Sequence, residues 1–180
     1  MPRNIEIKAK IQSVDSLLPL AAVIADHGPM GITHDDTFFN CPNGRLKLRA
    51  FSDSDGQLIF YRRPDIAGPR ESFYIISPIV SPDTLREALS FAYGQRGRVR
   101  KHRTLFTVGR TRIHLDRVEK LGHFIELEVV LNEGEPVEAG IAIAHELLRK
   151  LNISRQQLIE ESYIDLLKRL DAGASDSQKS

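Results

Sequence analysis

The chain has 180 residues, 41% hydrophobic and 27% charged, a composition typical of one soluble globular domain with a single core. Its 25 Lys and Arg residues against 24 Asp and Glu residues give a net charge of +1, which argues against a protein that coats nucleic acid. A single cysteine, Cys41, excludes an intramolecular disulfide and a multi-cysteine zinc site. No segment approaches the roughly 18 apolar residues of a membrane span, and the first ten residues lack a signal core. We therefore expect a cytoplasmic protein that engages neither nucleic acid nor membrane.

The first half of the chain predicts strands with two helices among them. Residues 4–11 alternate strictly between apolar and polar side chains, which is the period of a strand. Residues 15–27 have helical spacing that Gly28-Pro29 ends. Further strands are predicted at residues 33–39, 45–52, 57–63 and 71–79. A helix over residues 81–93 follows, with Gly94 beyond its end.

The second half predicts three strands and two closing helices. The strands lie at residues 99–108, 112–118 and 123–131, and the helices at residues 139–151 and 158–170. About eight strands, mostly linked as hairpins, predict an α+β fold in which an antiparallel barrel carries helices on its outside. We assign residues 1–171 to this one domain and predict a disordered polar tail over residues 172–180.

Several predicted strands have one face lined by charged residues. Side chains two positions apart on a strand point the same way, so each of the following sets shares a face: Glu6, Lys8 and Lys10; Arg45, Lys47 and Arg49; Lys101 and Arg103; Arg112, His114 and Asp116; Glu126 and Glu128. Arg62 shares its face with apolar residues and is the least regular member.

The charged faces have two interpretations. Each face on its own could simply be solvated, as in half-buried antiparallel sheets. The charges are, however, sorted by sign, and like charges side by side on a strand repel each other. Arg and Lys bind phosphate oxygens, and clustered carboxylates bind Mg²⁺ or Mn²⁺. A barrel lined by both kinds of group suits a metal–triphosphate. No Walker-type loop and no GxGxxG motif offers an alternative nucleotide site.

The order of several short motifs resembles that of a known family. These motifs are Asn4-Ile5-Glu6-Ile7-Lys8, Leu48-Arg49, Lys101-x-Arg103, His114-Leu115-Asp116, Gly122-x-Phe124-Ile125-Glu126-Leu127-Glu128 and Ser162-Tyr163-Ile164-Asp165-Leu166-Leu167. The set resembles the CYTH-domain proteins, or triphosphate tunnel metalloenzymes, and within them the branch of class IV adenylyl cyclase. The resemblance runs from about Asn4 to Leu170 and implies an eight-stranded antiparallel tunnel with a charged lumen, which is usually a homodimer in this branch.

The resemblance also implies the roles of particular residues. Substrate phosphates would be held by Lys8, Lys10, Lys47, Arg49, Arg62, Lys101, Arg103 and Arg112. The Mg²⁺ or Mn²⁺ ligands would be Glu6, Asp116, Glu126 and Glu128. Glu6, Lys8 and Asp116 would be the catalytic residues. The family motif has a glutamate where this chain has Asn4, so a second metal is expected to bind more weakly.

Three functions are compatible with this resemblance. The first is conversion of ATP to cyclic AMP and pyrophosphate. The second is hydrolysis of tripolyphosphate, thiamine triphosphate or a nucleoside triphosphate. The third is a polyphosphate- or nucleotide-binding module without activity. In each case, loss of Lys101 or Arg103 is expected to weaken ligand binding and to preserve or raise stability, because it relieves clustered like charges.

Overall fold

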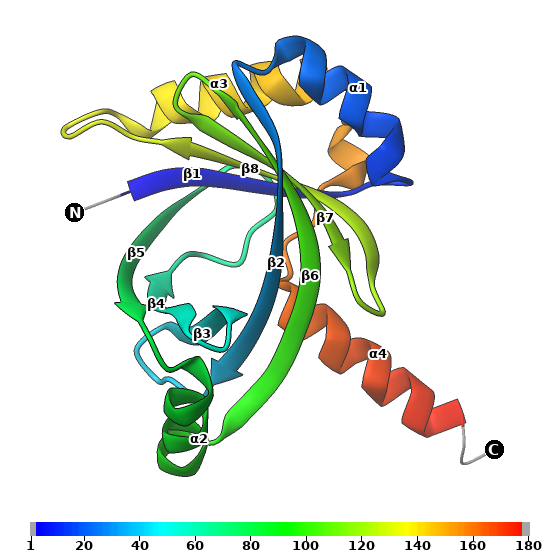
Figure 1. Ribbon diagram of the computed structural model, residues 1–180. Helices are drawn as coiled ribbons and strands as arrows, with labels where there is room; N and C mark the ends of the chain where they lie inside the picture. The colour runs from blue at the N-terminus through cyan, green and yellow to red at the C-terminus, as the bar shows by residue number, and fades with distance from the viewer. Residues whose placement is uncertain (1–2, 178–180) are drawn as a thin grey trace.

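The computed structural model describes residues 3–177, and their side chains as far as residue 174. Eight antiparallel strands form a closed barrel in the order β1-β5-β4-β3-β2-β6-β7-β8, and β8 pairs with β1 to close it (Figure 1). The strands are β1 (Arg3–Lys10), β2 (His27–Phe39), β3 (Arg45–Ser52), β4 (Asp55–Arg62), β5 (Arg70–Ile79), β6 (Gln95–Val108), β7 (Thr111–Val118) and β8 (Gly122–Val130). The predicted α+β barrel is thus confirmed.

Four α-helices and one 3₁₀ turn accompany the barrel. They are α1 (Val14–Ile24), α2 (Pro82–Tyr93), α3 (Val137–Lys150), η1 (Arg155–Gln157) and α4 (Tyr163–Ser177). Helices α1 and α3 lie together on one side of the barrel, whereas α2 and α4 lie near the opposite side (Figure 1). None of the helices between residues 3 and 177 is long and apolar enough to cross a membrane.

The main hydrophobic core lies between the outer face of the barrel and helices α1 and α3. It joins Ile5, Ile7 and Ala9 of β1 to buried residues of β7, β8 and the two helices. These apolar residues alternate with the charged residues of the same strands, because successive side chains of a strand point to opposite faces. Burial of each large apolar side chain stabilises the fold by roughly 1.5–3 kcal/mol. The outer faces thus supply the core, and the inner faces are free to carry charge.

Two predicted boundaries differ from the structure for physical reasons. Strand β2 begins at His27, six residues before the predicted start, since its pairing with the long β6 continues past Gly28-Pro29 with a register shift. Helix α4 begins at Tyr163, five residues later than predicted, because Leu158 bridges to Ala9 and the Ile159 amide donates to the Lys8 carbonyl. Cross-strand pairing overrides local helical or turn propensity in both places.

Helix α4 also continues beyond its predicted end. It runs to Ser177, whereas the sequence predicts that this helix ends at residue 170. Two alanines and no proline occur in this stretch, and such a composition can extend a helix that has already formed. The last three residues of the predicted tail lie outside the described residues.

Candidate functional site

Alternate residues of all eight strands face one cavity inside the barrel. The cavity has a volume of about 350 Å³. The structure brings together in its wall nine of the residues expected to form the site, namely Glu6, Lys8, Lys47, Arg49, Lys101, Arg103, Arg112, Glu126 and Glu128. The predicted strand faces therefore converge on one enclosed volume, and an open sheet with solvated charges is excluded.

The lining changes in character along the barrel axis. At one end, the lining residues Phe38, Val99 and Tyr163 belong to a second buried apolar cluster, which also contains Phe124. Tyr163 is the first residue of α4. We call this the closed end. Charged residues form the middle of the lining. At the other end, which we call the mouth, the lining residues include Ile76, whose exposure is 45%.

Two buried aspartates hold the cations of the middle section in place. Asp36 on β2 accepts two hydrogen bonds from Arg49, both of 2.8 Å, and lies 3.3 Å from the Lys47 ammonium. Burial alone would raise the pKa of Asp36, but Arg49 and Lys47 lower it well below its usual range. These cations are therefore oriented before any ligand arrives, which reduces the entropy cost of binding an anion.

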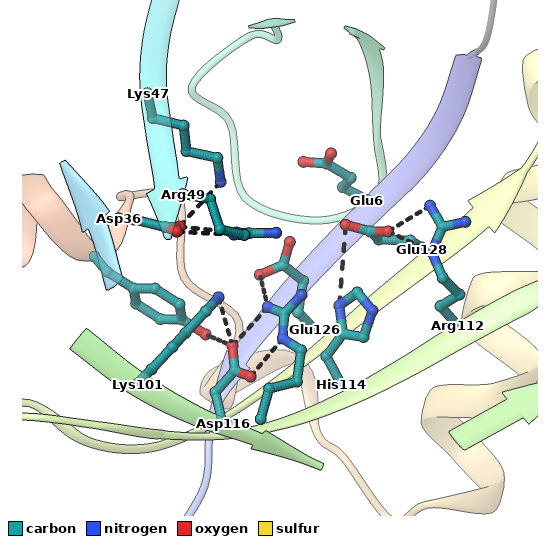
Figure 2. A network of polar contacts seen from close by, with 12 residues as sticks. Glu6, Asp36, Lys47, Arg49, Lys101, Arg112, His114, Asp116, Glu126 and Glu128 are labelled. Carbon is teal, nitrogen blue, oxygen red and sulfur yellow. Dashed lines mark hydrogen bonds and ion pairs between the residues drawn. The ribbon is translucent and has the colours of Figure 1, made fainter. Parts of the chain in front are cut away.

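Asp116 is the second of these aspartates, and its surroundings differ from the expected metal-ligand role. Its side chain is fully buried, accepting two hydrogen bonds of 2.7 Å from Arg103, one of 3.1 Å from Lys101 and one of 2.9 Å from the Tyr163 hydroxyl (Figure 2). Burial opposes ionisation, yet Arg103 and Lys101 lower the pKa of Asp116 well below its usual range. Its oxygens are already occupied by donors, so we correct the expectation and assign Asp116 to positioning the cations.

This arrangement also corrects the expected effect of removing Lys101 or Arg103. The two cations do not simply repel each other, because Asp116 lies between them. Burial, and Arg103 beside it, lower the pKa of Lys101 to about 8, an effect that Asp116 partly offsets. Loss of either cation would leave a buried carboxylate poorly compensated, so stability should fall rather than rise.

A group that could hold a divalent cation lies nearer the mouth. One ligand atom from each of His114, Glu126 and Glu128 lies within 4.8 Å of the others. Burial and the nearby Arg103 lower the pKa of His114 to about 3, so the imidazole is neutral and has a lone pair to offer. The buried His114 Nδ1 atom also has no hydrogen-bond partner among the residues that the structure describes. The two carboxylates fit Mn²⁺ or Mg²⁺, and the imidazole nitrogen favours a transition metal such as Mn²⁺ over Mg²⁺.

Glu6 lies close to this cation-binding group, and the neighbouring carboxylates affect its pKa. Burial, followed by the charges of Glu126 and Glu128, raises the pKa of Glu6. A guanidinium nitrogen of Arg63 approaches the Glu6 carboxylate at 3.4 Å. A bound cation would relieve the repulsion among the three carboxylates, so Glu6 remains a candidate fourth ligand. Figure 2 shows Glu6 on the side of the cavity near Glu128.

Lys8 differs from the other cations of the lining in its lack of an ion-pair partner among the described residues. Its ammonium nitrogen lies 4.1 Å from the centre of the Tyr163 ring. Within the described part of the chain, no carboxylate forms an ion pair with it. Burial lowers the pKa of Lys8 to about 7, although Glu126 partly offsets this effect. An amine with such a pKa can lose or gain a proton near neutral pH, which is the property required of a general base.

Two of the cations expected in the site lie elsewhere. Arg62 is exposed on the outside of the barrel, where its Nε atom donates to the Asn43 carbonyl at 2.8 Å. The inward residues of β4 are Ile59 and Tyr61, and Arg63 continues the same face into the cavity. Lys10 is exposed at the end of β1, beyond the lining. The structure thus replaces Arg62 with Arg63 and leaves Lys10 outside the cavity.

Sequence reasoning missed several lining residues. Asp36 stands in a short segment with a second aspartate, Asp35, and nothing in that pattern distinguishes the two. His114 shares a strand face with Arg112, and this position could have indicated that His114 is a third ligand of the cation. Tyr163 reads as a packing aromatic, since its role depends on α4 meeting the closed end of the barrel.

The fold and lining together define a class of proteins, namely closed antiparallel barrels that enclose a charged tunnel. The CYTH domain family matches residues 2–163, and the chain belongs to this family. None of the curated proteins compared with the chain matches it.

Solved structures of three proteins illustrate the similarity. The PH1012 protein of Pyrococcus horikoshii has a TM-score of 0.80 at 20% identity, covering 91% of this chain and 98% of its own. A protein of Vibrio parahaemolyticus described as a candidate adenylate cyclase has a TM-score of 0.73 at 19% identity, covering 92% and 97%. A Hippeastrum protein, described as a candidate adenylyl cyclase with a dominant triphosphatase activity, has a TM-score of 0.64 at 15% identity, covering 94% and 96%. At such identities the likeness shows the fold alone.

Proposed function

We propose that this protein is a metal-dependent enzyme that cleaves a phosphorus–oxygen bond of a triphosphate bound in the tunnel, in the manner of class IV adenylyl cyclase. One observation carries the proposal: oriented cations and a cation-binding group of acids and histidine share the wall of one enclosed cavity. A triphosphate with a divalent cation needs both kinds of group at once.

The role of each lining residue follows from its position in the cavity. Lys47, Arg49, Lys101 and Arg103 would bind the phosphate oxygens. Glu126, Glu128 and His114, with Glu6 nearby, would hold Mg²⁺ or Mn²⁺. When bound, the cation supplies positive charge that offsets the charge of the phosphates. Binding within a cavity walled by oriented charges excludes water and fixes the reacting atoms.

In the cyclase reaction the ATP 3′-hydroxyl oxygen forms a bond to the α-phosphorus. The bond from that phosphorus to the α,β-bridging oxygen breaks, and pyrophosphate leaves. Lys8, as the free amine, would accept the hydroxyl proton. Lys101 and Arg103, beside the phosphate chain, would stabilise the departing negative charge.

Hydrolysis is the second candidate, and the position of Lys8 against Tyr163 favours it, because a ligand that enters with its phosphates leading brings its terminal phosphate toward this end. A water oxygen would attack the terminal phosphorus, Lys8 would accept its proton, and the phosphoanhydride oxygen would leave with the rest of the ligand. The dominant triphosphatase activity named for the Hippeastrum protein supports keeping this alternative. The two reactions differ in nucleophile and in the phosphorus attacked, whereas the binding residues are the same.

Incubation of the protein with ATP and Mg²⁺ or Mn²⁺ tests the proposal. Cyclic AMP with pyrophosphate would support cyclisation, and orthophosphate would support hydrolysis. Tripolyphosphate and thiamine triphosphate should be tried in parallel. Absence of turnover of every triphosphate, while binding persists, would leave only the binding module and overturn the proposed enzyme.

Arg63 and Arg62 form a matched pair for testing the phosphate contacts. We expect Arg63→Ala to weaken tripolyphosphate binding by about ten-fold or more, since a hydrogen bond to a charged group contributes roughly 1.5–3 kcal/mol. Arg62→Ala should change binding by less than about two-fold, because Arg62 lies outside the barrel. Calorimetric titration with tripolyphosphate and Mg²⁺ measures both. Equal effects of the two substitutions would contradict the placement of Arg63.

A further inference from the structure

The wall of the barrel changes in kind at the point where β5 begins. Strand β1 pairs with β5 only as far as Glu6 and Arg70. Beyond this pair, the Ile159 amide donates to the Lys8 carbonyl at 3.0 Å, so the segment before α4 takes the place of β5 beside β1. Residues 63–69, which we call the strap, lie between the end of β4 and the start of β5. Two irregular segments thus lie near Lys8.

Arg70 joins these two segments. It is 2% exposed, and its Nη1 atom donates to the Ile66 carbonyl of the strap at 2.6 Å and to the Glu160 carbonyl at 3.1 Å. Among the described residues, no carboxylate forms an ion pair with Arg70, and its Nε and Nη2 atoms have no hydrogen-bond partner. Burial of a charge without a counter-charge is costly, so tethering alone does not account for a charged side chain here.

Arg45 attaches the strap to α4 in a second place. Its Nη2 atom on β3 donates to both carboxylate oxygens of Asp65 in the strap, at 2.6 and 2.8 Å. The same nitrogen lies 3.6 Å from the Asp165 carboxylate on α4. Two neighbouring residues of the strap are therefore fixed next to the beginning of α4, the helix whose first residue, Tyr163, lines the cavity.

The strap begins with Arg63, which is one of the cations of the cavity lining. The last pair of β4 with β5 joins Arg62 to Phe73, so Arg63 follows the end of the ladder. Its side chain is 5% exposed and lies 3.4 Å from the Glu6 carboxylate. The position of Arg63 therefore depends on the course of the strap rather than on strand pairing.

Arg70 and Arg63 also affect each other through their charges. Burial, followed by the charge of Arg63, lowers the pKa of Arg70, and Glu6 and Glu126 offset this effect in part. Like charges repel each other, so Arg70 on β5 disfavours a turn of the Arg63 guanidinium away from the cavity and toward β5. A neutral donor at position 70 could bind the same carbonyls but would not exert this repulsion.

We propose that Arg70 is a positioning residue of the triphosphate site, which holds Arg63 in the cavity by tying the strap to the segment before α4. This inference rests on the proposed function, because it assumes that Arg63 contacts a phosphate. Arg70 is not among the residues that line the cavity. Its effect on the ligand would therefore pass through Arg63.

A double-mutant cycle tests this link. We expect Arg70→Met to weaken tripolyphosphate binding by about ten-fold, as Arg63→Ala does, since a charge-assisted contact is lost in both. The double variant should bind within about two-fold of either single variant, because both substitutions remove the same contact. Arg70→Gln, which keeps a donor for the carbonyls, serves in the same cycle if Arg70→Met does not fold. A residue that only stabilises the fold would give additive losses.

Arg86→Met is the matched control. The Arg86 side chain is 13% exposed and its Nε atom donates to the Thr37 hydroxyl at 3.0 Å, which ties α2 to β2 outside the cavity. Its loss should leave tripolyphosphate affinity within about two-fold of wild type. Calorimetric titrations with tripolyphosphate and Mg²⁺, below the melting temperature of each variant, measure all these affinities.

The outcomes separate the inference from the proposed function. Coupled losses for positions 63 and 70, with no loss for Arg86→Met, support the positioning role. Additive losses, unchanged affinity of the variants at position 70, or an equal loss for Arg86→Met overturn that role while the proposed function stands. Failure of the wild type to bind any triphosphate would instead overturn the proposed function.

Discussion

Replacing Glu126 with Gln is expected to lower turnover by two to three orders of magnitude, on the order of 3–4 kcal/mol of transition-state stabilisation. The substitution keeps the shape of the side chain but removes one negative ligand from the group with His114 and Glu128. A divalent cation would then bind more weakly, and excess Mn²⁺ should restore part of the activity. Steady-state rates across a series of Mg²⁺ and Mn²⁺ concentrations measure both effects.

The control for this experiment is an exposed glutamate outside the barrel. Glu138 lies in the first turn of α3, and Glu138→Gln should leave turnover and cation dependence unchanged. Glu128→Gln should behave like Glu126→Gln. Full activity of both Glu126→Gln and Glu128→Gln in the presence of a chelator would exclude a role for the metal.

Asp116→Asn is expected to have the largest effect on folding, a loss of about 3–5 kcal/mol in the free energy of unfolding. Asn keeps the shape of the side chain but leaves the buried Lys101 and Arg103 without their compensating charge. Urea denaturation followed by circular dichroism measures the loss. Asp35→Asn is the matched control, because Asp35 pairs with Arg98 at the surface, where ion pairs contribute only up to about 1 kcal/mol. Losses of similar size in the two variants would contradict the role given to Asp116.

The same substitution should change the acid side of the stability profile. The pKa of Asp116 is lowered in the folded protein, so its contribution is present above the pKa of an unfolded aspartate, roughly 3.9. That contribution is lost as the pH falls further and the carboxylate takes up a proton. Asp116→Asn should therefore be less stable than wild type at neutral pH, and the difference should shrink in acid.

The extent to which the sequence predicts the site depends on the pattern of each strand. In β3, charged residues alternate with Leu46 and Leu48, so the inward face is readable. In β4, the residues from Leu58 to Tyr61 are all apolar or aromatic, and a pattern without alternation does not reveal which side faces inward. The alternation in this strand therefore does not show that Arg63, rather than Arg62, faces the cavity.

The sequence also cannot predict how deep within the barrel each inward-facing residue lies. Period-two alternation places His114 and Asp116 on the same face, but it does not say which lies near the cation-binding group. That distinction comes from the register of β7 with β6, which pairs Asp116 with Arg103. The contact from Tyr163 depends on a helix 47 positions away along the chain, and a local pattern cannot reveal it.

The closed end of the cavity has a consequence for the order of kinetic events. Phe124, Tyr163 and their neighbours fill that end, so a ligand that enters with its phosphates leading must leave by the way it came. On the proposed function, the product derived from the organic group would depart first, and the phosphate-containing product, held by the buried cations, would depart last. Added pyrophosphate should then compete with substrate for the empty enzyme, whereas the organic product should inhibit non-competitively. Release of the inner product would limit the rate of each cycle, and weaker phosphate binding could raise turnover.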